Sequence, residues 1–189
     1  MKKLVLLLTV LSLASCKTVK DPAGPADRFV IEDLIQLTST DIKNRYPDAN
    51  IEEDVGMFDE GTDERPYTIL FPDTQDELHI TWDDSEKTRT HDIRFSEGGK
   101  WKSNSGIKVG TTYKELNQLN GKEISFYGFG WDYSGAVAWN DGKFENSNLF
   151  VFLEAKEIPG KFYADHIVKA TPEEIALMDM KVKTIMYKR

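Results

Sequence analysis

The sequence predicts an α+β fold: an antiparallel sheet built from two helix-plus-three-strand units, with short helices on one face. Three observations indicate this class. Short apolar segments of period two alternate with turn residues. Short helices with strong start signals precede the groups of strands. The order of elements is similar, although the residues differ, in 28–105 and 106–189. Residues 28–189 are therefore expected to form a single domain, and an internal duplication into these halves is one possibility.

The first half begins with an apolar segment, RFVIEDLIQL at 28–37, which we interpret as a strand; a short helix is the alternative. Thr38-x-x-Asp41 then begins a short helix, which Pro47 ends. Further strands are expected at 50–57, 67–71, 78–82 and 88–95, with an acidic loop over 59–66.

The second half begins with a capping box, Thr112-x-x-Glu115, followed by a short helix that Asn120-Gly121 ends. Strands are expected at 124–131, 135–139 and 149–153. The glycines among the aromatic residues of 124–131 favour a bulge, or the close approach of another backbone. Thr171-Pro172 begins a third helix. The closing strand at 180–188 is expected at a sheet edge, because its lysines discourage further pairing.

The N-terminus has the organisation of a secretory signal. Lys2-Lys3 is followed by an apolar segment at 4–13, which is too short to span a bilayer as a stable helix. This segment ends in Leu-Ala-Ser-Cys at 13–16. That ending resembles the lipobox of bacterial lipoproteins, and the alternative is an ordinary signal peptide with an unrelated cysteine. The resemblance implies a signal peptide at 1–15, lipid on Cys16 and a membrane-anchored tether at 16–27.

The remaining composition limits the location and the chemistry. Cys16 is the only cysteine, so the mature chain is expected to have neither a disulfide nor a cysteine nucleophile. The formal net charge of −8 argues against nucleic acid as a partner. By analogy with bacterial lipoproteins, Lys17 implies the outer membrane, and the lack of an acidic run after Cys16 favours its periplasmic side. We therefore expect a lipid-anchored protein of the cell envelope.

The segment from Ile107 to Phe144 contains GTTYKELNQLNG and, further on, GFGWDYSG. It resembles an uncharacterised family of Gram-negative lipoproteins with the pattern GTTxxELxxLNG…GFGWDYxG, for which no activity is implied. The repeated helix-and-strands order more remotely resembles the tandem architecture of β-lactamase-inhibitor proteins and of small outer-membrane assembly lipoproteins. This second resemblance concerns topology and carries little about function.

Catalytic and metal-binding motifs are missing from the sequence. There is no Gly-x-Ser-x-Gly elbow, phosphate-binding loop or dinucleotide fingerprint. His79, His91 and His166 lack metal-ligand spacing, although the first two lie on adjacent predicted strands. The acidic segment 59–64 could attract calcium but lacks the EF-hand order, and a solvated surface is the alternative. We predict a protein that is not an enzyme and has no cofactor or metal.

The best candidate for a binding surface is Trp131-Asp132-Tyr133, because Trp and Tyr at a hairpin end are typical anchors of protein interfaces. The alternative is that Trp131 packs in the core and Asp132 only makes the turn. The leading hypothesis is a non-catalytic binding or interaction module with an envelope protein as its possible partner. The other hypotheses are an inhibitor of an envelope hydrolase, and a cell-wall or glycan hydrolase with an acidic pair.

Overall fold

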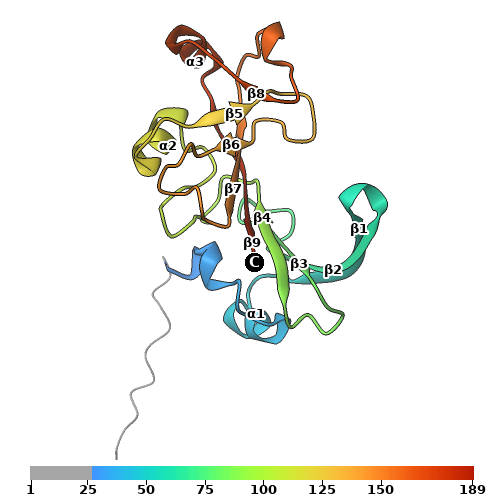
Figure 1. The fold of residues 1–189 in the computed structure, drawn as a ribbon. Coiled ribbons are helices and arrows are strands. Elements are labelled where there is room, and N and C mark those ends of the chain that lie inside the picture. Colours follow the sequence, from blue (N-terminus) through green and yellow to red (C-terminus); the bar gives the residue numbers. More distant parts are fainter. Residues whose placement is uncertain (1–26) are drawn as a thin grey trace, which may run out of the picture.

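The fold is that of a computed structural model, which describes residues 27–189. The signal peptide, Cys16 and the tether up to residue 26 lie outside the described residues. Residues 27–189 form an α+β structure with three α-helices, a six-stranded sheet and a three-stranded sheet, and the paired strands in both sheets are antiparallel (Figure 1). In this part of the chain, no helix is both long enough and apolar enough to cross a membrane.

The sequence had suggested a strand for the first apolar segment, but the structure shows that this segment is not a strand. It forms two 3-10 turns, η1 (Asp27–Phe29) and η2 (Ile31–Asp33), with only an isolated bridge from Val30 to Lys102 between them. Phe29, Val30 and Ile31 are all buried. Because consecutive side chains are buried rather than alternate ones, the segment lacks the two-residue period of a half-buried strand.

The three helices begin where the sequence predicts them. They are α1 (Ser39–Arg45), α2 (Tyr113–Asn120) and α3 (Pro172–Met178). Each is preceded by a threonine whose hydroxyl accepts from a backbone N–H, and an acidic side chain three residues further on accepts from the threonine's own backbone N–H. The helix α2 ends at Gly121, which has a left-handed φ of 73°. The three predicted starts are confirmed, as are the predicted ends of α1 before Pro47 and of α2 at Asn120-Gly121.

The six-stranded sheet has the order β1-β2-β3-β4-β9-β7. Its strands are β1 (Glu52–Phe58), β2 (Asp63–Leu70), β3 (Leu78–Trp82), β4 (Thr90–Phe95), β9 (Lys181–Lys188) and β7 (Leu149–Glu154). The first unit therefore has four strands after its helix, near the four segments expected individually, and not the three of the two-unit scheme. The prediction that the closing strand lies at an edge is wrong, since β9 pairs with both β4 and β7. Val182 and Ile185 of β9 are fully buried, which makes a central position favourable.

The hairpin of β1 and β2 projects from the body as an arm (Figure 1). Only the last part of β2, from Tyr67, pairs with β3, so the earlier residues of β2 pair with β1 alone. The predicted acidic loop is correspondingly shorter: its first part is the turn η3 (Asp59–Gly61), and β2 already begins at Asp63. Val55 and Met57 are 53% and 58% exposed on this arm.

The three-stranded sheet has the order β6-β5-β8, with β6 (Val137–Ala138), β5 (Ser125–Tyr127) and β8 (Ile167–Val168). The predicted strand 124–131 is thus shorter than expected. Gly128 shows the reason: a Cβ there would lie 2.5 Å from the Ala164 carbonyl oxygen, so another backbone approaches it closely, one of the two outcomes expected. A bridge between Ala136 and Phe152 joins the two sheets.

One face of the six-stranded sheet is buried and the other is open. Residues of the inner face pack into the core with the helices and the N-terminal turns, and they include Leu70, Leu78, Ile80, Trp82, Ile93, Phe95, Leu149, Val151, Val182 and Ile185. Residues that alternate with them on β4, β7 and β9 are exposed or half-buried, apart from the buried Met186, and they include Arg94, Phe150, Phe152, Thr184 and Lys188. We call this the outer face.

Candidate functional site

The loop between β5 and β6 carries the three residues that the sequence selected. Trp131 and Tyr133 are 61% and 65% exposed, and Asp132 is exposed between them. The other three tryptophans, Trp82, Trp101 and Trp139, are buried. The alternative in which Trp131 packs in the core is therefore wrong. The structure places its indole in solvent, where it is available for contact.

Local hydrogen bonds hold this loop in a compact turn. The Ser134 N–H donates to the Trp131 carbonyl at 2.9 Å, and the Ser134 hydroxyl accepts from the Gly130 N–H at 3.2 Å. The Ala136 N–H donates to the Tyr133 carbonyl at 2.8 Å. The turn is thus closed by backbone groups and Ser134, and the Asp132 side chain is left free of this role. Residues 130–135 present their large side chains outward on a fixed backbone.

A second segment lies against this loop. It includes the turn η4 (Gly160–Phe162) and leads into β8. The Phe129 N–H donates to the Phe162 carbonyl at 2.8 Å, and the Gly128 N–H donates to the His166 carbonyl at 3.0 Å. Tyr163 is 58% exposed beside the loop. Sequence reasoning did not select Tyr163, because its proximity to the loop depends on contacts between segments about 30 residues apart.

Together these segments form a surface that we call the aromatic corner, which consists of Tyr127, Trp131, Tyr133, Tyr163 and Ile167. The rings of Tyr127 and Tyr133 lie 5.6 Å apart between centroids. Between the two segments is a small cavity of about 280 Å³, lined by Tyr127, Gly128, Trp131, Asp132, Tyr133, Ala164 and Asp165. Exposed aromatic side chains are thus grouped around a hollow.

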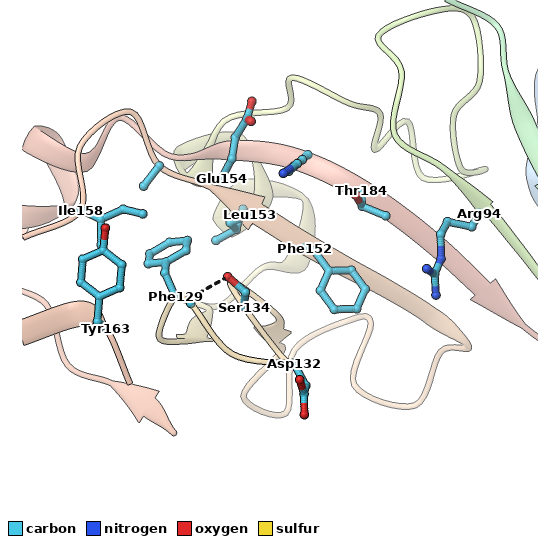
Figure 2. A pocket seen from close by; sticks show the side chains of 13 residues that line it. Arg94, Phe129, Asp132, Ser134, Phe152, Leu153, Glu154, Ile158, Tyr163 and Thr184 are labelled. Atoms are coloured by element: carbon cyan, nitrogen blue, oxygen red, sulfur yellow. Dashed lines mark hydrogen bonds between the residues drawn. The ribbon is translucent and has the colours of Figure 1, made fainter. Parts of the chain in front are cut away.

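A larger cavity, of about 620 Å³, lies on the other side of the same loop (Figure 2). Its apolar lining includes Phe129, Phe152 and Tyr163, and Arg94 lies at one end. Asp132 lines both this cavity and the small one. The loop therefore separates two hollows, and its single acidic residue, Asp132, borders both.

A third cavity, of about 290 Å³, extends from Arg94 toward the arm, where Phe58 and Asp59 line it. Arg94 lines both this cavity and the larger one, and its Nη2 donates to the Met186 sulfur at 3.3 Å. Arg94 therefore borders both cavities, which lie next to one another on the outer face of the sheet. We call them together the outer groove.

The charged groups near the arm end of the outer groove form a structural network. The Arg65 guanidinium donates to an Asp83 carboxylate oxygen at 2.9 Å, and His91 Nδ1 lies 2.9 Å from the same oxygen. Although partial burial alone would raise it, the pKa of Asp83 is lowered, because His91, Arg89 and Arg65 favour the charged carboxylate. These side chains satisfy one another, as expected of groups that hold strands together.

The candidate metal and catalytic groups are dispersed. His79 contacts Glu77, His91 contacts Asp83 and His166 contacts Asp165, so each of the three histidines has a different carboxylate partner. Among residues 27–189, including the acidic tip of the arm, no three side chains of the metal-ligating types gather into a binding group. Asp132 and Glu154 both line the larger cavity, but Figure 2 shows them pointing away from one another.

The architecture defines a class: an α+β protein with an open antiparallel sheet face and an aromatic corner at one end. This fold is similar to the crystal structure of the uncharacterized protein yfeY from Escherichia coli, with a TM-score of 0.51 and 13% sequence identity. The likeness covers 82% of this chain and 90% of that one, and at this identity it concerns the fold alone. No protein-family model matches the chain, and no curated protein does either.

Proposed function

We propose that the chain is a lipid-anchored, non-catalytic binding module of the bacterial envelope, with the aromatic corner as its binding surface and the outer groove beside it. The observation that carries this proposal is Trp131, the only exposed tryptophan of four, standing between other exposed aromatic side chains above a cavity. Large, rigid aromatic anchors of this kind contribute strongly to binding, because they bury much area at a low cost in conformational entropy.

The location in the proposal comes from the lipobox at Cys16. The anchor would attach the chain to the outer membrane on its periplasmic side, where an envelope protein or another envelope component would meet the aromatic corner. The acidic net charge makes nucleic acid an unsuitable partner. No cofactor is part of the proposal.

Cysteine footprinting tests whether the corner is occupied in the envelope. Cys16 is the only native cysteine, and lipid would block its thiol, so a cysteine placed at the rim of the small cavity can be labelled alone. Ala164 suits this purpose, because it is half-buried, lines that cavity and has no polar side-chain group whose loss could weaken binding. The matched control is Leu177→Cys on α3, a position that is 52% exposed.

We expect Ala164→Cys to react with a maleimide more slowly in isolated envelopes than in purified full-length protein, and Leu177→Cys to react equally in both. Adding Trp131→Ala to Ala164→Cys should restore fast labelling in envelopes, since it removes the main anchor. Equal rates for Ala164→Cys in the two preparations would contradict the proposal.

An inhibitor of an envelope hydrolase is a second candidate. The observation that favours it is the turn at residues 130–135, which offers Trp131 and Tyr133 to solvent on a fixed backbone beside an open groove. A loop of this form could enter an enzyme cleft without prior ordering. The purified protein would then slow a β-lactamase, a protease or a lysozyme, and the double variant Trp131→Ala, Tyr133→Ala would not. Full enzyme activity across this panel in the presence of the wild-type protein would remove this candidate.

A further inference from the structure

The small cavity of the aromatic corner has aromatic walls and an acidic rim. Its walls include the rings of Tyr127, Trp131 and Tyr133, and the rings of Trp131 and Tyr133 are more than half exposed. Asp132 and Asp165 stand at the rim. Asp165 has one hydrogen-bonding contact, to the neighbouring His166 ring at 3.2 Å, so both carboxylates keep oxygens free to accept further hydrogen bonds.

The floor of this cavity is rigid. Gly128 lies so close to the backbone of the facing segment that a Cβ there would be 2.7 Å from the Phe162 carbonyl oxygen and 2.8 Å from the Ala164 nitrogen. The hydrogen bond from Gly128 to His166 ties the same two segments together. A ligand would therefore find the cavity already formed, which lowers the cost of binding.

The size of the cavity limits the ligand. Pockets for drug-sized ligands have volumes of about 300–1,000 Å³, so a cavity of about 280 Å³ suits a single ring that continues into solvent. The two carboxylates at the rim would repel a phosphate or a carboxylate on the ligand. They would accept hydrogen bonds from hydroxyl groups instead. The aromatic walls require an apolar face on the same ring.

A pyranose ring has both properties: an apolar face of C–H groups and an edge of hydroxyl donors. We propose that the small cavity binds one pyranose ring of an uncharged glycan, an inference that rests on the proposed function of the aromatic corner. The ring packs on Trp131 and Tyr133, and its hydroxyls donate to Asp132 and Asp165. Neighbouring sugars extend from the corner into solvent.

Tryptophan fluorescence provides a direct test. Iodide quenches exposed indoles, so in purified full-length protein in detergent it acts on Trp131, while the buried Trp82, Trp101 and Trp139 report that the fold is intact. The probes are chitotetraose, cellotetraose and maltotetraose, with the anionic tetragalacturonic acid as the charged control. We expect at least one neutral tetrasaccharide to reduce quenching in a saturable manner, and the charged control to have no effect.

Two variants locate the binding. Tyr133→Ala should weaken binding of the protective glycan about 10-fold, because it removes one aromatic wall. Phe150→Ala is the matched control: it removes an exposed aromatic side chain of β7 that lies outside the aromatic corner and does not line the small cavity, and should leave the affinity unchanged. Equal effects of the two variants would overturn the assignment to this cavity.

The failure of this inference can be told from the failure of the proposed function. If no neutral tetrasaccharide alters quenching while Ala164→Cys is still protected in envelopes, the corner binds another ligand, such as a protein, and the glycan inference is wrong. If neither effect occurs, both the inference and the proposed function are wrong.

Discussion

At the scale of single residues, Gly135 has a position that no other residue type can take without rearrangement. Its φ is 70°, and a Cβ there would lie 2.2 Å from the Leu153 carbonyl oxygen. The Gly135 carbonyl accepts from the Leu153 N–H at 2.8 Å. This close approach is one of the contacts that join the two sheets beside the loop of Trp131.

We expect Gly135→Ala to lower the free energy of unfolding by about 3 kcal/mol, because the methyl group would push the two backbones apart. The control is Gly106→Ala, where φ is 86° but no atom lies within 4 Å of the added Cβ, so the loss should be about 1 kcal/mol. Urea unfolding measures both. Equal losses would mean that backbone conformation alone, and not the approach to Leu153, makes glycine necessary.

Glu53 is a second residue whose role depends on distant partners. Its carboxylate accepts from Lys43 Nζ at 2.6 Å and from the Ser39 hydroxyl at 2.7 Å, and Lys87 Nζ lies 3.1 Å away. Although burial disfavours the charged form, the hydrogen bonds from Lys43, Ser39 and Lys87 outweigh it and lower the pKa of Glu53 to about 2. Glu53 therefore joins α1 to the sheet as a carboxylate.

A lowered pKa contributes stability above the pKa of the unfolded chain, near 4.5, and this contribution is lost as the pH falls toward 2. We expect Glu53→Gln to cost about 1 kcal/mol at pH 7, because solvent screens a partly exposed ion pair. The difference from the wild type should shrink between pH 4.5 and pH 2. Glu52→Gln, on the neighbouring exposed residue, serves as the control. A difference for Glu53→Gln that does not change with pH would contradict the role of its charge.

At the scale of elements, the end of α2 is held by a buried amide. Asn120 is 2% exposed, and its Nδ2 donates to the carbonyls of Trp139 and Lys122 at 2.8 and 3.1 Å. Its Oδ1 accepts from the Phe144 N–H at 3.3 Å. The pattern Asn120-Gly121 predicted where the helix stops, but the amide also binds the turn after β6 from inside the molecule.

We expect Asn120→Leu to destabilise the protein by about 3 kcal/mol, because the Trp139 carbonyl and the Phe144 amide would lose their buried partner. Gln118→Leu is the matched control, since it replaces an exposed amide on the same helix and should change stability by less than about 0.5 kcal/mol. Chemical denaturation measures both variants. A small effect of Asn120→Leu would show that water replaces the amide at this turn.

At the scale of the whole molecule, the start of the described chain and the candidate site lie at different ends. The turns η1 and η2 lie near α1, whereas the three-stranded sheet next to the aromatic corner is at the other end (Figure 1). A lipid on Cys16 would be attached through the tether that precedes residue 28. In the proposed function, this arrangement would hold the binding surface away from its anchor.

Cys16→Ser should abolish incorporation of radiolabelled fatty acid and move the protein from the membrane fraction to the soluble fraction, because the thiol that carries the lipid is removed. Ser15→Ala, which keeps a small residue before the cysteine, should leave both properties unchanged. Fatty acid labelling and membrane association that survive Cys16→Ser would remove the envelope location and the tether from the proposal.

The extent of prediction from sequence also differs with scale. The helix starts at Thr38, Thr112 and Thr171 were correct, since a capping box acts over four residues. The placement of β9 at an edge was wrong. Burying Val182 and Ile185 favours a central position more strongly than the charged lysines beside them disfavour further strand pairing. For the site, the sequence selected Trp131, Asp132 and Tyr133, but it gave no means of finding the neighbours that surround them.

The sequence by itself determined what depends on nearby residues: the three capped helices, the strand pairs joined by short turns and the candidate anchor at Cys16. Only the tertiary structure decided that β9 lies between β4 and β7, that Trp131 is exposed and that Tyr163 stands beside it. The physical reason is range. Capping and turn formation act within a few residues, whereas strand order and exposure follow from how the whole chain buries its apolar surface.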